Sequence, residues 1–142
     1  MKPELPPIAK LAEQLLLEVE QAVRRFPRYH KYQHGAVLRV QAMTVAQLVN
    51  RAWRDPSRRA VWLQELAWAA DELKLSLQLG KQLQAFTSAG AFEQIARLAV
   101  ELGQQCGGWQ KQHAKGLNAT PPAPQRAQLL STRAASTFEA QP

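Results

Sequence analysis

The sequence is poor in cysteine and in long hydrophobic runs. Its 142 residues include one cysteine, Cys106, which cannot form a disulfide within the chain and is typical of a reducing compartment. No apolar run approaches the roughly 18 residues that a membrane span needs. Residues 1–4 lead into an amphipathic pattern without the apolar core and cleavage site of a signal peptide. We therefore expect a cytoplasmic protein with no membrane partner.

The sequence also lacks the patterns that mark most enzymes. It has no pair of metal-binding aspartates in a strand context, no glycine-rich phosphate loop and no nucleophile with a plausible base. Cys106 lies at helical spacing among apolar residues, which predicts a small core residue. His30 and His34 are four residues apart, but no third ligand is nearby, so we expect neither a metal nor a cofactor. These absences predict a protein that is not an enzyme.

Acidic residues are absent from residues 21–54, and this absence concentrates positive charge. The basic residues of this segment sum to the formal net charge of the whole chain, +7, while basic and acidic residues balance elsewhere. Such a segment indicates a surface that faces a polyanion, although a solvated basic face without a partner remains the alternative. For His30 and His34 we expect phosphate contact or packing beside Gly35. The candidate binding residues are Arg24, Arg25, Arg28, His30, Lys31, His34, Arg39, Arg51, Arg54, Arg58 and Arg59.

Apolar residues recur every three or four positions, which predicts helices at about 6–25, 31 or 36 to 53, 56–86 and 90–113. Asp55 and Pro56 should begin the third helix, since the carboxylate can accept from orphan amides and proline has no amide to leave unpaired. Short connections favour an antiparallel up-down four-helix bundle within residues 1–115. Residues 116–142 are rich in Pro, Ala, Ser and Thr, so we predict a flexible tail.

The third helix carries two apolar stripes. Leu63, Leu66, Ala70, Leu73, Leu77 and Gly80 form the main seam, and Trp68, Leu75, Leu79, Leu83 and Phe86 form a second line on a neighbouring face. Both must be buried, within the bundle or against another molecule. Gly103 and Gly107 are interpreted as sites of close helix packing. Trp53 and Trp62 flank the Asp55 turn, where burial within one chain would be incomplete, so we expect them to contact a neighbouring subunit or another protein. Trp109 lies at helical spacing from Leu102 and Cys106, which favours the core or a subunit interface over stacking on a base. The candidate oligomer-interface residues are Trp53, Trp62, Trp68 and Trp109.

Several short motifs occur in a fixed order along residues 10–113. They are Phe26-Pro27-Arg28, His34-Gly35, Leu38, Leu66, Asp71-Glu72-Leu73-Lys74, Phe92-Glu93-Gln94-Ile95-Ala96, Glu101-Leu102-Gly103 and Gly107-Gly108-Trp109. In their order and spacing the sequence resembles the Avd family, the accessory variability determinant proteins of diversity-generating retroelements. The closing Gly-Gly-Trp and the Phe-Pro-Arg segment favour this branch among small bacterial four-helix bundles, which include proteins encoded in ribosomal RNA intervening sequences.

The resemblance implies a basic four-helix bundle that assembles into a homopentameric barrel and binds the reverse transcriptase of the retroelement. The complex would copy template RNA into cDNA with errors at adenines, and the cDNA would replace a variable region of a target gene. The basic residues would then contact RNA, DNA or the polymerase. A second class remains open: a general oligomeric helical scaffold or a ribosomal-RNA-associated protein of the intervening-sequence type, with no polymerase partner.

Overall fold

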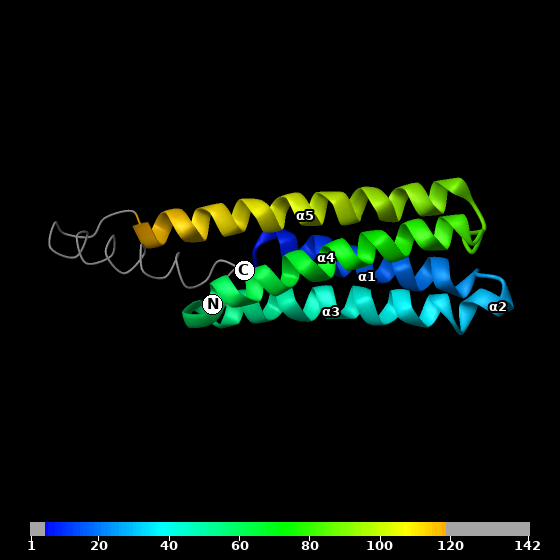
Figure 1. Cartoon of the computed structure of the whole chain (residues 1–142), viewed down its shortest axis with the longest axis horizontal. Helices are drawn as coiled ribbons and strands as arrows, with labels where there is room; N and C mark the ends of the chain where they lie inside the picture. The colour runs from blue at the N-terminus through cyan, green and yellow to red at the C-terminus, as the bar shows by residue number, and fades with distance from the viewer. Residues whose placement is uncertain (1–4, 119–142) are drawn as a thin grey trace, which may run out of the picture.

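The computed structural model describes residues 5–118, which form long helices joined by short connections (Figure 1). The long helices are α1 (Pro7–Arg24), α3 (His34–Arg54), α4 (Arg59–Gln82) and α5 (Ala89–Asn118). A single-turn helix, α2 (Arg28–Lys31), precedes α3, and a 3-10 turn, η1 (Pro56–Arg58), precedes α4. α3 packs against α1 and α4, and α5 packs against α4 and α1. The regular structure of the described residues is entirely helical, which confirms the all-α class.

The core is built from the main apolar stripe of each long helix. The predicted seam of the third helix is buried throughout, as expected. Cys106 is also buried, and its thiol donates to the carbonyl oxygen of Leu63 at 3.5 Å. Burial raises the pKa of this thiol to about 11, so it stays protonated and unreactive at neutral pH. The prediction of a core cysteine is confirmed.

The end of α4 differs from the sequence prediction. The helix stops at Gln82 instead of residue 86, because Gln84 adopts a left-handed backbone conformation with φ of 58°. The amide of Ala85 then donates to the carbonyl of Gly80 at 3.0 Å, which is the closing bond of a Schellman motif. Phe86 turns back into the bundle and packs edge-on against Phe26, with ring centroids 5.0 Å apart.

α5 is longer than predicted. It continues through Asn118, beyond the boundary placed at residue 115. The prediction of a flexible tail falls mainly on residues 119–142, which lie outside the described residues. Within residues 5–118, no helix is both long enough and apolar enough to cross a membrane.

Two glycines allow the close approach of α3 to its neighbours. His34, at the start of α3, places its Nε2 atom 2.7 Å from the carbonyl oxygen of Ser76 on α4. Since a carbonyl can only accept, Nε2 carries the proton. A Cβ atom added to Gly80 would lie 3.1 Å from this nitrogen and 2.9 Å from the ring of Phe86. A Cβ atom at Gly35 would lie 2.6 Å from a methyl group of Val23, so both positions require glycine for packing.

We expect Gly80→Ala to lower the free energy of unfolding by about 1–3 kcal/mol, because the new methyl group overpacks the His34 contact and outweighs the gain in helix propensity. The matched control is Gly107→Ala on α5. A Cβ atom there would meet nothing within 4 Å, so this change should stabilise the protein by up to about 1 kcal/mol. Urea unfolding followed by circular dichroism measures both effects. If both substitutions change the free energy of unfolding in the same direction, the packing assigned to His34 is contradicted.

Candidate nucleic-acid interface

The basic segment does not form one continuous surface. α3 extends about 30 Å from His34 to Arg54, so the basic residues near its start and those near its end form two separate groups. We call the first group, around α2, the α1–α3 corner: Arg24, Arg25, Arg28, His30 and Lys31. We call the second group, around η1, the α3–α4 corner: Arg51, Arg54, Arg58 and Arg59. The two corners lie at opposite ends of the bundle (Figure 1).

The α1–α3 corner carries exposed basic side chains that make few contacts within the chain. Arg25 and Arg28 are exposed, and neither has an ion-pair partner among residues 5–118. Arg24 lies 3.6 Å from Glu20, but its side chain is 69% exposed, so this pair stabilises little. The Lys31 ammonium lies 5.8 Å from the centroid of the Tyr32 ring. Exposed arginines such as Arg25 and Arg28 can bind phosphate groups without losing an ion pair within the described residues.

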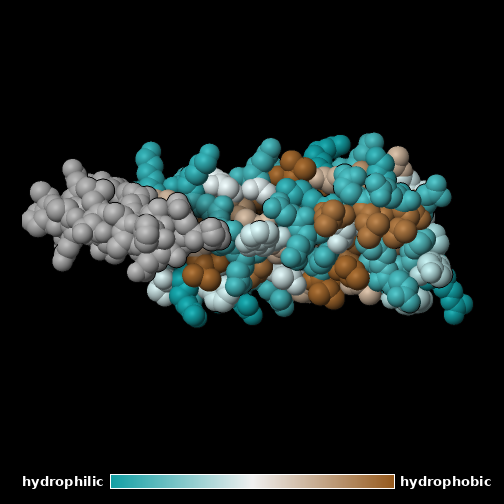
Figure 2. All heavy atoms as spheres, in the orientation of Figure 1, coloured by the Kyte–Doolittle hydropathy of each residue, from teal (hydrophilic) through white to brown (hydrophobic). Residues whose placement is uncertain are grey.

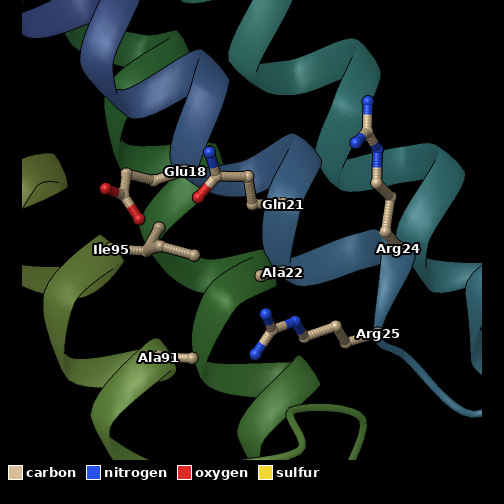
Figure 3. Close-up of a pocket in the computed structure, with 7 residues that line it drawn as sticks. All are labelled: Glu18, Gln21, Ala22, Arg24, Arg25, Ala91 and Ile95. Atoms are coloured by element: carbon tan, nitrogen blue, oxygen red, sulfur yellow. The ribbon is translucent and has the colours of Figure 1, made fainter.

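Arg24 and Arg25 point to different sides of the corner. Figure 3 shows the Arg25 guanidinium beside Ala22, directed into the space between α1 and α5, whereas the Arg24 side chain, although Arg24 also lines this space, extends in another direction. That space is a hollow of about 390 Å³ whose lining also includes Glu18 and Gln21. The hollow contains a carboxylate as well as arginines, so it is not a dedicated anion pocket. The exposed outer surface of the corner remains the better candidate for phosphate contact.

Two tyrosines at this corner were missed by the sequence analysis. Tyr29 is 80% exposed and Tyr32 is 66% exposed, and both adjoin basic residues of α2. The missed signal was the alternation of basic and aromatic residues in Arg28-Tyr29-His30-Lys31-Tyr32. Such interleaving is typical of surfaces that bind single-stranded nucleic acid.

The arginines of the α3–α4 corner have structural partners. Arg51 and Arg58 lie over the Trp62 ring, with guanidinium carbons 5.3 Å and 5.9 Å from its centroid. Arg59 donates from Nε to the carbonyl of Ala52 at 2.7 Å and from a terminal nitrogen to that of Trp53 at 3.0 Å. It thereby satisfies carbonyls at the C-terminal end of α3, which attracts positive charge.

Asp55 supports this corner in a different way from the predicted one. Its carboxylate forms no capping hydrogen bond to a backbone amide. It accepts instead from the Trp62 indole at 3.0 Å and from the Ser57 hydroxyl at 2.8 Å. These two hydrogen bonds, the one from Trp62 first, lower the pKa of Asp55. Asp55 therefore occupies the predicted N-cap position and Pro56 begins the turn that leads into α4, but the expected capping hydrogen bond is absent.

Several predicted binding residues make contacts within the bundle. His34 is buried with its ring bonded to Ser76, so it acts in packing, and its assignment to the binding surface is corrected. Arg39 forms an ion pair with Glu20 at 2.8 Å and is half-buried. His30 is half-buried and packs edge-on against Tyr29. The candidate binding surface is consequently smaller than the sequence indicated.

The four tryptophans have different environments. Trp62 and Trp109 pack against the core of their own chain, and the Arg59 guanidinium lies 5.7 Å from the Trp109 ring centroid. Trp53 is half-buried and borders an apolar hollow of about 170 Å³ between α1 and α3. Trp68, by contrast, is 63% exposed. The structure therefore leaves Trp68, and in part Trp53, available for contact with another molecule.

The second stripe of α4 is largely unburied. Leu75 is 73% exposed, Leu79 and Leu83 are also exposed, and Phe86 alone of this line packs against the core. Figure 2 shows hydrophobic side chains gathered over the second half of α4 and over neighbouring α3. Gly103 and Gly107 do not serve close packing within the chain, since an added Cβ would meet only Lys74 Nζ at Gly103 and nothing at Gly107. That interpretation of the two glycines is corrected for the single chain.

The residues that the structure describes hold no group of three or more His, Cys, Asp or Glu side chains that could bind a metal ion. No protein-family model and no curated protein matches the chain.

Proposed function

We propose that this protein is a non-enzymatic accessory protein that binds nucleic acid and the reverse transcriptase of a diversity-generating retroelement. The resemblance to the Avd family suggests the system. The single observation that supports binding best is the α1–α3 corner, where Arg25 and Arg28 are exposed without ion-pair partners in the described part of the chain. Their positive charge would attract the phosphates of template RNA and cDNA and release counterions.

The two basic corners suit two partners. We assign nucleic acid to the α1–α3 corner, where Arg25 and Arg28 are exposed, and the polymerase to the α3–α4 corner. Arg51 and Arg58 are held over Trp62, so this corner presents an ordered cationic and aromatic surface. Arginine and tryptophan are enriched at the energetic centres of protein interfaces. A separation of about 30 Å along α3 would let one subunit contact both partners.

A scaffold or ribosomal-RNA-associated protein is the second candidate, because the exposed α1–α3 corner could bind structured RNA without any polymerase. Co-purification separates the two. We expect a tagged copy of this protein to retain the reverse transcriptase encoded in the same retroelement after nuclease treatment. Retention of ribosomal RNA with no reverse transcriptase would favour the second candidate.

We also propose that the four long helices form an antiparallel up-down bundle, and that five copies assemble into a homopentameric barrel. The exposed apolar face of α4 supports assembly. Trp68, Leu75 and Leu79 recur at intervals of seven and four residues, so they share one side of the helix. A contiguous apolar face of this kind on a soluble chain marks a contact with another molecule.

We expect light scattering on the purified protein to give a mass about five times 15.9 kDa. Replacing Leu75 and Leu79 with glutamine should shift the mass toward that of one chain, because the interface loses apolar area while the core is untouched. The matched control replaces Val100 and Leu117, which are exposed on α5, with glutamine as well. A monomeric wild-type protein at micromolar concentration, or equal effects of the two double variants, would contradict assembly through α4.

A further inference from the structure

Two exposed tyrosines occupy the same corner as the unpaired arginines. From this arrangement we infer that Tyr29 and Tyr32 form a stacking platform, which makes the α1–α3 corner select single-stranded nucleic acid over duplex. The inference rests on the proposed nucleic-acid surface and names the form of nucleic acid that this surface prefers.

The local backbone places the two tyrosines one helical turn apart. Tyr29 lies within α2, and Tyr32 is its C-terminal flanking residue with helical dihedral angles of −94° and −6°. Residues three apart on a helical turn lie on the same side of it, so both tyrosine side chains start from one side of the turn. Neither tyrosine belongs to the apolar core of the described residues. The rings therefore contribute little to the packing of the chain and remain available to a ligand.

Basic residues flank the two tyrosines. Arg28 and Lys31 are interleaved with the tyrosines in α2, and exposed Arg25 lies just before it. Aromatic rings with flanking cations bind a single strand in two ways, because bases stack on the rings while phosphates contact the cations. In a duplex the faces of the bases are covered by neighbouring base pairs, so the rings gain nothing and only the cations contribute. The arrangement should thus distinguish the two forms by stacking.

The test compares the affinity of the full chain for a labelled mixed-sequence single-stranded RNA with its affinity for the same RNA annealed to its complement. We expect the double variant Tyr29→Ala, Tyr32→Ala to weaken single-strand binding at least tenfold and to change duplex binding less than twofold. The slope of log affinity against log salt concentration should stay the same, since no phosphate contact is removed. Replacing both tyrosines with phenylalanine should retain single-strand binding, because the ring faces remain.

The control is the double variant Arg25→Ala, Arg28→Ala, which should weaken both forms and reduce the salt slope. Light scattering on the tyrosine variant should show the wild-type mass. Equal losses for single strand and duplex, unchanged affinity for both, or a change of assembly in the alanine variant would overturn the inference. No reverse transcriptase is present in this assay, so its outcome is independent of whether the accessory role is correct.

Discussion

Changing Arg24, Arg25, Arg28 and Lys31 together to glutamate should abolish nucleic-acid binding, with a loss on the order of 100-fold or more at about 0.1 M salt. Each substitution removes two units of positive charge, so the formal net charge falls from +7 to −1. The first three side chains are exposed and Lys31 is half-buried, so the fold should survive. The glutamate at position 24 would face Glu20 across one helical turn, which costs a few tenths of a kcal/mol. Fluorescence anisotropy measures binding, and circular dichroism checks that the helices remain.

A second quadruple variant separates the corner from net charge. Lys10, Arg97, Lys111 and Lys115 are exposed on α1 and α5, and replacing them with glutamate gives the same net charge of −1 from +7. We expect this control to keep a clear preference for single-stranded RNA and to bind far better than the corner variant. If both variants lose binding equally, the α1–α3 corner is not the site and the affinity reflects charge alone.

The helical seams were predictable because burial on a helix imposes a period of three to four residues. The seam through Leu63, Leu73 and Leu77 follows this period and is buried in the structure. The end of α4 was not predictable in this way. Apolar spacing continues through Leu83 to Phe86, while the left-handed turn uses Gln84, which carries none of the signal that glycine or asparagine would give.

The basic residues of the candidate site could be predicted from the sequence, but their arrangement in space could not. A segment without acidic residues is visible in the sequence, yet the length of α3 divides it into two corners. The neighbours that neutralise or bury a side chain come from other helices. Arg39 meets Glu20 of α1, and His34 meets Ser76 of α4, which lies 42 positions away in the sequence. Such contacts follow from helix packing and leave no local pattern that a single sequence reveals.

The exposed tyrosines show the opposite case, because their signal was local. Alternating basic and aromatic residues in α2 suggest a surface role, since aromatic side chains destined for the core would follow the apolar period of a long helix. Tyr29 and Tyr32 depart from that period and are exposed. An interpretation based on charge alone therefore leaves the two tyrosines out of the α1–α3 corner.

The proposed polymerase contact should depend on the α3–α4 corner. Reversing Arg51, Arg54 and Arg58 to glutamate should reduce co-purification of the reverse transcriptase while single-stranded RNA binding is retained, since these residues lie about 30 Å along α3 from the α1–α3 corner. Arg59 is left unchanged because it binds the carbonyls of Ala52 and Trp53, and its loss would disturb the end of α3. The corner variant with Arg24, Arg25, Arg28 and Lys31 reversed provides the complementary control.

The most direct measurement of the accessory role is cDNA synthesis by the purified reverse transcriptase on the template RNA, with and without this protein. We expect full-length, template-primed cDNA with errors at adenines when the protein is present, and little or none when it is absent. Each corner variant should fail to restore synthesis, one through loss of RNA and the other through loss of the polymerase. Full-length cDNA at equal yield and equal adenine error rate with and without the protein would contradict the accessory role.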